Sequence, residues 1–467
     1  MSNLFNILNI TSSGMYTAQT AVEVTSHNIA NINTPGYSKQ SAVIETQIPA
    51  MGNGLLLGRG SVVTQVKRNE DRFLNYQVNK NTWLLGKLDA QTRYSEPLEE
   101  IFNEAYNEGL ADGLSDFFQS LQDLASAPEG QAERTAVLGR AKTIVGRFHM
   151  LDSRLSDVAE SADDEIGYAI NDVNRIVSQI AELNNKVSTL EGTGHNANDF
   201  RAQRTASLAE LAELIDYSYF EDDNGMINVQ VGNGRPLVEG ILGGKLVGVN
   251  NPANGNYKDV YFEDANGNQS NITSFIENGT IAGAIDVRDN TIGNLKTQLD
   301  EIAYAMVTEF NTQHASGFNL NGATGQDFFT ALGSSTNAAQ LIEIDPAVLG
   351  DVNNIAAGLT NAPGDNQNAN LLSAIENSEI LNGGTWTLQD QYSAMVSDIG
   401  TVAQNAQLNY AHQESVANQV INVRESIAGV SLEEEMANLV KFQESYSASA
   451  KMFQAVSEMV QILMSIE

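Results

Sequence analysis

Both ends of this 467-residue chain carry amphipathic patterns with the spacing of paired helices. Near the N-terminus, apolar or small residues recur in alternating steps of four and three, which is typical of a coiled-coil seam. The seam comprises Leu4, Leu8, Thr11, Met15, Ala18, Val22, Thr25, Ile29 and Ile32. Pro35 and Gly36 end it, because proline has no N–H for helical hydrogen bonds and disfavours helical backbone at the residue before it. We therefore predict an N-terminal helix followed by a tight turn.

The C-terminal pattern begins after Gly429, which breaks a preceding helical stretch. Ser431 and Glu434 have the spacing of a capping box, in which two side chains satisfy free N–H groups at a helix start. The apolar face comprises Leu432, Met436, Leu439, Phe442, Tyr446, Ala450, Phe453, Val456, Val460 and Leu463. Because an isolated helix of this kind is only marginally stable in water, we expect the two terminal helices to pack against each other and against neighbouring copies.

Charged side chains are scarce in the N-terminal pattern, where Glu23 is the only Asp, Glu, Lys or Arg before Lys39. A helix that faces solvent normally displays charges on its outer side. The N-terminal helix is therefore expected to meet protein on several sides. The alternative is that both seams are ordinary intramolecular core.

Long helical patterns fill much of the middle of the chain. They run from about Glu70 to Asn103, from about Glu133 to Leu190, and again from Ala284 to His314. The second helix would be ~85 Å long at about 1.5 Å per residue. Such a length suits a shaft better than the core of an enzyme.

Other stretches favour β-structure or irregular chain. Residues 40–48 and 61–68 are β-prone runs on either side of a glycine-rich segment, which predicts a hairpin or an extended linker. From Tyr217 to about Gly283, short β-prone runs alternate with Asn-Gly and Gly-Asn turns, which predicts a β-rich insertion. A second Gly- and Asn-rich stretch extends to about Gly384.

These patterns predict a mainly α-helical, discontinuous multidomain protein with a β-rich insertion. Its expected parts are a terminal coiled-coil assembly core, residues 1–45 with 420–467; a long-helix bundle as shaft, residues 46–216 with 284–329 and 385–419; and an outer β-rich domain, residues 217–283, to which 330–384 is a candidate addition.

Composition excludes several kinds of partner and site. With 58 acidic against 25 basic residues, a net charge of -33 would repel phosphate backbones and anionic lipids, so we expect no nucleic-acid and no membrane partner. The chain has no cysteine, which excludes disulfides, metal sites with thiolate ligands and catalytic cysteine nucleophiles. No Lys or Arg precedes Lys39, so the basic region of a cleaved signal peptide is missing. Cytoplasmic residence and export without a cleaved signal both remain open.

No constellation of residues points to catalysis, a cofactor or a metal. The histidines are widely spaced in the sequence: His27, His149, His195, His314 and His412. The run Asp264 to Asn268 resembles the start of a calcium loop, but its glycine comes too early, and a β-turn is the better interpretation. Acidic pairs could act as acid and base on a glycan, yet adjacent side chains point apart, which favours a solvated surface. These pairs are Glu99 with Glu100, Asp163 with Asp164, and Asp222 with Asp223.

Both ends also resemble a known family. Residues 25–40, TSHNIANINTPGYSKQ, resemble the N-terminal signature of flagellar rod, hook and hook-associated proteins, and residues 430–466 resemble the matching C-terminal helix. Internal segments are similar to the hook-associated protein 1 (FlgK) family, and they include ASAPEGQAERTAVLGRAKTIVGRF, which ends at Phe148, and the segment from Leu299 to Phe329.

The resemblance implies a structural, non-enzymatic subunit of the bacterial flagellum that forms the junction between hook and filament and is required for filament assembly. It further implies a homo-oligomeric ring that contacts the hook protein and a second hook-filament junction protein. An export chaperone would bind the C-terminal helix before type III export. The chain would then be extracellular, secreted without a cleaved signal peptide. The alternatives are a hook or rod component, an enzyme acting on cell-wall glycan, and a β-rich adhesin.

The family signature and the helix seams together nominate the residues of the assembly interface. They are Met15, Ala18, Val22, Asn28, Ile29, Asn31, Pro35, Gly36 and Tyr37 near the N-terminus, and Leu432, Met436, Leu439, Phe442, Tyr446, Phe453 and Val460 near the C-terminus.

Overall fold

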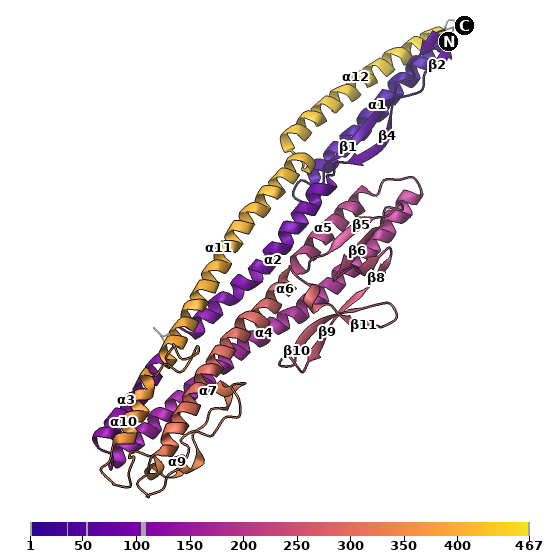
Figure 1. Ribbon diagram of the computed structural model, residues 1–467. Coiled ribbons are helices and arrows are strands. Elements are labelled where there is room, and N and C mark those ends of the chain that lie inside the picture. The colour runs from indigo at the N-terminus through magenta and orange to yellow at the C-terminus, as the bar shows by residue number, and fades with distance from the viewer. Residues whose placement is uncertain (1, 35, 53–54, 104–108, 466–467) are drawn as a thin grey trace.

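The protein is an elongated rod of helices, and its first and last helices lie together at one tip (Figure 1). Its structure, a computed structural model, describes residues 2–34, 36–52, 55–103 and 109–465. From the tip, the chain continues into a shaft of long helices. Two small sheets lie against the side of the shaft, and irregular segments cover its far end.

The tip is an antiparallel pair of helices with a β-hairpin beside it. Helix α1 (Ser2–Ala30) packs along α12 (Leu432–Ser465). Strands β1 (Gln40–Thr46) and β4 (Ser61–Arg68) pair antiparallel and contact α1. Short strands β2 (Ala50–Gly52) and β3 (Leu55–Leu57) pair farther along the hairpin. The hairpin prediction for residues 40–68 is therefore confirmed.

The shaft consists of long helices packed along one another. They are α2 (Arg72–Ile101), α4 (Gln131–Gly192), α7 (Gly293–Ser316) and α11 (Leu388–Ala428), joined by the shorter α3 (Leu110–Ser126) and α5 (Asn198–Leu214). The helix expected from Glu133 to Leu190 is confirmed as α4, two residues longer at each end. Its apolar residues recur every three or four positions and are buried, because they face the neighbouring helices.

The β-rich insertion expected from Tyr217 to Gly283 is confirmed as two antiparallel sheets. The first has the order β5 (Ser218–Glu221), β6 (Ile227–Val231), β7 (Arg235–Glu239) and β8 (Leu242–Gly243), and the second has β11 (Gln269–Asn271), β10 (Tyr257–Glu263) and β9 (Lys245–Asn251). Both sheets bury apolar side chains against α4. The Asp264 run is a turn, since the Asp264 carboxylate accepts hydrogen bonds from the N–H groups of Asn266 and Asn268.

After the sheets, the short helices η1 (Thr273–Phe275) and α6 (Thr280–Ile285) lead into η2 (Asp286–Ile292), a π-helix that continues into α7. A π-helix has hydrogen bonds between residues five apart, one more than in an α-helix. Here the buried Arg288 of η2 reaches the Asp163 carboxylate on α4.

Residues 330–384 lie at the far end of the shaft (Figure 1). They form α8 (Ala338–Leu341), α9 (Pro346–Gly350), η3 (Val352–Asn354), α10 (Gln367–Ala374) and η4 (Ile375–Asn377). Their apolar side chains join a core that also holds Phe117, Phe310 and Phe328. This stretch therefore shares a hydrophobic core with the shaft, and the division of the chain into domains stays a prediction.

His314 is buried in this aromatic core as a neutral ring. Its Nδ1 lies 2.7 Å from the carbonyl oxygen of Gln326, and its Nε2 lies 2.9 Å from the N–H of Ala356, which donates to it. Burial lowers the pKa of His314 to about 4, because a charged imidazole would lose its hydration there. A second ring proton would also point at the N–H of Ala356.

We expect the protein to lose stability as the pH falls from 6.5 toward 4, because the unfolded chain takes up a proton at His314 that the folded chain does not accept. A pKa depressed from 6.5 to about 4 corresponds to about 3 kcal/mol of unfolding free energy at most. Urea unfolding of parent and His314→Gln at pH 7 and 4.5 measures the difference. The exposed His412 provides the control His412→Gln, which should keep the pH dependence of the parent.

Candidate assembly interface

The buried face of α1, which packs against α12 and against the hairpin strands β1 and β4, is made of small and polar residues. The buried residues of α1 are Thr11, Thr17, Ala18, Ala21, Thr25 and Asn28. A Cβ added to Gly14 would lie 3.7 Å from the Ser449 Cβ, so the two backbones approach closely there.

The seam of α1 differs in part from the one expected. Thr11, Ala18 and Thr25 are buried as predicted. Met15, Val22 and Ile29 are only half-buried. Of the residues that precede them, Gly14 and Asn28 contact α12, and Ala21 is buried. Where the two backbones approach closely, Gly14, Ala21 and Asn28 fit better than the bulkier residues that follow them in the sequence. The buried face of α1 is therefore turned by about one residue from the predicted one.

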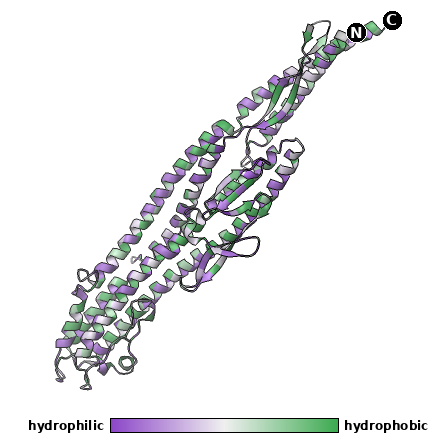
Figure 2. Cartoon of the chain, turned by 45° about the vertical axis from the view of Figure 1, so that its right-hand side comes forward, coloured by the Kyte–Doolittle hydropathy of each residue, from purple (hydrophilic) through white to green (hydrophobic). Residues whose placement is uncertain are grey.

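Helix α12 is largely uncovered. In its described part only Glu435 and Val456 are buried. Of its nominated residues, Leu439, Phe442 and Val460 are half-buried, whereas Leu432, Met436, Tyr446 and Phe453 are exposed. Figure 2 shows hydrophobic residues interspersed along the helix pair up to its tip. Covering each large apolar side chain would contribute ~1.5–3 kcal/mol, and an exposed apolar surface of this kind marks an interaction site.

A buried polar cluster joins the two helices where α1 ends and α12 begins. The Asn28 amide donates to Glu435 Oε2 at 2.8 Å and to the Gln40 carbonyl oxygen at 2.8 Å. Its carbonyl oxygen accepts from the Gln40 N–H at 2.9 Å and from the Tyr37 hydroxyl at 2.8 Å. Lys39 Nζ lies 3.0 Å from Glu435 Oε1 and 3.1 Å from Glu434 Oε2. The cluster thus links α1, the turn after it and α12.

Two effects set the charge state of this cluster. Burial lowers the pKa of Lys39, but its bonds to Glu435 and Glu434 outweigh burial and leave that pKa raised. Burial, together with the charges of Asp199 and Glu435, raises the pKa of Tyr37. Both groups therefore keep their protons at neutral pH, so Lys39 is a cation and Tyr37 a hydrogen-bond donor.

The remaining nominated residues lie in the turn. Asn31 donates from its side chain to the His27 carbonyl oxygen at 3.0 Å, which helps to end α1. Gly36 has a φ of 74°, and a Cβ there would lie 2.8 Å from the Ala206 Cβ, so only glycine fits. Pro35 lies outside the described residues.

Polar contacts connect the tip to the shaft. Gln40 donates to Asp199 at 2.8 Å, and Asn198 donates to the Val66 carbonyl oxygen at 2.7 Å. Two hollows of about 670 and 590 Å³ flank these contacts, and both are lined by His27 and Asp199. Polar contacts therefore attach the tip to the shaft, whereas buried apolar side chains join the helices within the shaft.

The sequence pattern could have revealed Glu435, which the nominated set omits. Counting back in sevens from Val456 gives Ser449, Phe442 and Glu435, so Glu435 occupies a seam position of α12. Lys39, Gln40 and Asp199 have no comparable signal, because their contacts depend on how the tip meets the shaft.

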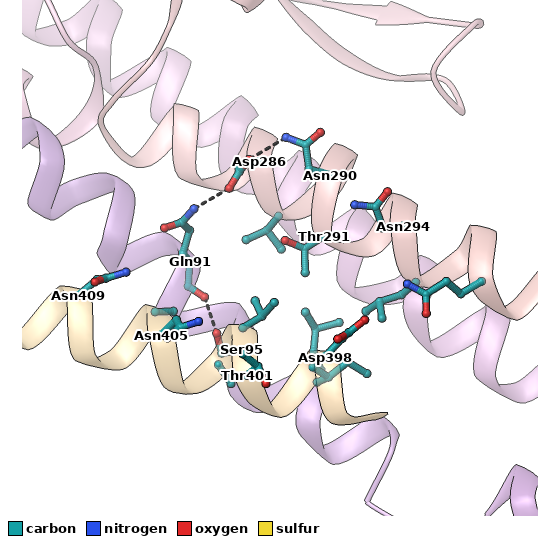
Figure 3. Close-up of a pocket in the computed structure, with 18 residues that line it drawn as sticks. Gln91, Ser95, Asp286, Asn290, Thr291, Asn294, Asp398, Thr401, Asn405 and Asn409 are labelled. Atoms are coloured by element: carbon teal, nitrogen blue, oxygen red, sulfur yellow. Dashed lines mark hydrogen bonds between the residues drawn. The ribbon is translucent and has the colours of Figure 1, made fainter. Parts of the chain in front are cut away.

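A hollow of about 490 Å³ lies within the shaft between α2, η2, α7 and α11 (Figure 3). Asparagine side chains crowd its rim, namely Asn290, Asn294, Asn405 and Asn409. Asp286 accepts hydrogen bonds from Gln91 at 2.5 Å and from Asn290 at 2.7 Å, so this carboxylate is occupied by amides.

The acidic pairs do not form a catalytic arrangement. Glu99 and Glu100 are both exposed. Asp163 is buried in ion pairs with Lys258 and Arg288, whereas Asp164 is exposed. Asp222 accepts hydrogen bonds from the N–H groups of a turn at Asn224 and Met226. Within the described ranges, no group of three or more His, Asp or Glu side chains is placed to hold a metal, and no described helix is long and apolar enough to span a membrane.

Comparison with known families gives three matches along the chain. Residues 95–329 match the flagellar hook-associated protein FlgK helical domain. Residues 8–37 match the flagella basal body rod protein family, and residues 425–466 match the flagellar basal body rod FlgEFG protein C-terminal family. The last two matches cover much of α1 and all of the described part of α12.

Relatives match over nearly the whole chain. Flagellar hook-associated protein 1 of Escherichia coli K12 is 27% identical, over 99% of this chain and 100% of that protein. The protein of the same description from Bacillus subtilis 168 is 26% identical, over 98% of each chain. The solved structure of the flagellar hook junction protein FlgK from Burkholderia pseudomallei has the same fold, with a TM-score of 0.68 at 15% identity over 76% of this chain and 100% of that one.

Proposed function

This chain belongs to the FlgK family of flagellar hook-associated proteins, and we propose that it is the structural subunit that joins hook to filament. The observation that carries the proposal is the uncovered apolar face of α12 at the tip. The two helices that match the rod-protein families are the ones that pair there. A subunit with such a tip is completed by its neighbours.

The proposal extends to a homo-oligomeric ring of this chain, with the hook protein below it and a second junction protein above it. The exposed apolar residues of α12 support neighbour contacts of this kind. The same face would need a cover before export, which supports a chaperone bound to α12 in the cytoplasm. Export through the type III route to the outside of the cell, without a cleaved signal peptide, completes the proposal.

We propose that the chain is structural and has no enzymatic activity. The acidic pairs lie exposed, in turns or in ion pairs, as described above. A hook or rod component is disfavoured as an alternative, because the FlgK helical-domain match covers residues 95–329 of the shaft and sheets.

Deleting the gene tests the junction role. We expect cells with hooks but no filaments, and filament subunits lost to the medium, because the filament has no surface on which to start. Electron microscopy of the cells and blotting of the medium measure both. Complementation with the full chain should restore filaments, and a chain lacking residues 432–465 should not. Normal filaments on the deletion strain would contradict the proposal.

A further inference from the structure

We propose that the buried cluster of Asn28, Lys39 and Glu435 fixes the register in which α1 and α12 pair. The inference concerns pairing within one chain, so it goes beyond the junction role and is tested without it. Lys39 and Glu435 would then be positioning residues, which set where each exposed apolar residue of the tip is presented to a neighbour.

The cluster is fully satisfied in the observed register. An asparagine side chain offers two N–H donors and two acceptor lone pairs, and all four of Asn28 are used, with Glu435, Gln40 and Tyr37 as partners. Glu435 is 1% exposed, and its second oxygen meets Lys39 at 3.0 Å. The Asn28 amide and the Lys39 ammonium group therefore both have Glu435 as a partner only when Glu435 lies opposite Asn28.

The rest of the seam is tolerant of sliding. In the observed antiparallel pairing, Asn28 meets Glu435 and Gly14 meets Ser449. A slide of one heptad, about 10.5 Å along the helix, would place Ala21 opposite Ser449 and Gly14 opposite Val456. Small residues accept both of these pairings without a clash.

The polar cluster opposes that slide at the same end of the pair where the Lys39 N–H donates to the Ala428 carbonyl oxygen at 2.8 Å and ties the turn to α11. The slide would place Phe442 against Asn28, and the Asn28 amide would lose its carboxylate partner in a buried position. A buried polar group without a partner loses its hydration with no compensating bond, and a single buried asparagine is known to fix register in coiled coils. The register is therefore encoded at one end of the pair, next to the turn.

Competition between two disulfides in one chain tests this inference, since the natural chain has no cysteine. The reporter carries Gly14→Cys, Ala21→Cys and Ser449→Cys. A Cβ at position 14 would lie 3.7 Å from the Ser449 Cβ, close to the separation of about 3.8 Å in disulfides. Positions 14 and 21 lie about 10.5 Å apart on one helix, too far to pair with each other. The purified full chain is equilibrated in glutathione buffer, and mass spectrometry measures the ratio of the 14–449 to the 21–449 disulfide.

We expect the reporter to favour the 14–449 disulfide by about tenfold or more, the scale of one unpaired buried group. Adding Glu435→Leu should lower the ratio by about threefold or more, toward the value in urea, where the pairing is lost. The matched control is Glu434→Leu, which removes an exposed carboxylate that also contacts Lys39 and should leave the ratio unchanged. If Glu435→Leu gives neither disulfide, Glu435→Gln, which keeps the size and one acceptor, should lower the ratio severalfold. A parent reporter without preference, or Glu435 variants with the ratio of the parent, would overturn the proposal.

Discussion

Replacing Leu439 or Phe453 with aspartate should abolish incorporation of the chain into the flagellum while leaving the shaft folded. Both residues lie on the face of α12 that the chain itself covers only in part. Each change loses the ~1.5–3 kcal/mol of one buried side chain in every subunit, and it also places a charge among apolar side chains of the proposed interface. Immunoblotting of isolated flagella measures incorporation.

The control for this experiment is Gln443→Asp, which adds the same charge at an exposed polar position of α12 and should still assemble. Circular dichroism and thermal unfolding of the purified variants report on the shaft. If the Leu439 or Phe453 variant unfolded as a whole, α12 would be ordinary core and the assembly interface would lie elsewhere.

Asp163→Ala should destabilise the shaft and the attached sheets by about 1–3 kcal/mol, the cost of leaving buried donors without their acceptor. Asp163 accepts from Arg288 Nη1 at 2.7 Å and from the Lys258 backbone N–H at 2.7 Å, and its second oxygen meets Lys258 Nζ. The Arg288 side chain is 0% exposed, so water cannot replace the lost carboxylate. Arg288 would keep its ion pair with Asp289 and its bond to the Lys258 carbonyl oxygen. Urea unfolding of the purified chain measures the change.

Asp164→Ala is the matched control, because Asp164 also contacts Lys258 but is exposed. A solvent-exposed ion pair contributes about 0–1 kcal/mol, so this variant should unfold close to the parent. Burial raises the pKa of Asp163, but the hydrogen bonds from Lys258 and Arg288 outweigh burial and hold that pKa below its usual range. Asp163 is therefore charged at neutral pH. Equal destabilisation by both substitutions would contradict the assigned roles.

Elements set by local rules could be predicted from the sequence. The hairpin of residues 40–68 and the helix from Gln131 to Gly192 follow from side-chain period and from breaking residues, which act over a few positions. Gly429 ends α11 as expected. One of the two bonds of the predicted capping box forms, since the Ser431 hydroxyl accepts from the Glu434 N–H at 3.5 Å. The Glu434 carboxylate accepts from Lys39 instead of completing the box.

Features set by contacts between distant segments could not be predicted. The heptad pattern indicates a paired helix, but the close approach at Gly14 decides which residues of α1 face α12. Residues 330–384 carry no strong period, and their place follows from Phe117 and Phe328 in a core assembled from several helices. The interface role of the nominated residues stays a prediction, because it concerns neighbours of the chain.

Helix α4 contributes side chains to both hydrophobic cores, with Val137 to Ala162 in the core at the far end and Ile166 to Ala181 in the core beneath the sheets. One unbroken helix of 62 residues thus forms one side of both cores. Fraying of this helix at one core reaches the side that it forms in the other, so we expect the two cores to be coupled in unfolding. A bending or twisting load on the rod is likewise carried through continuous backbone hydrogen bonds, without a joint between domains that could slip.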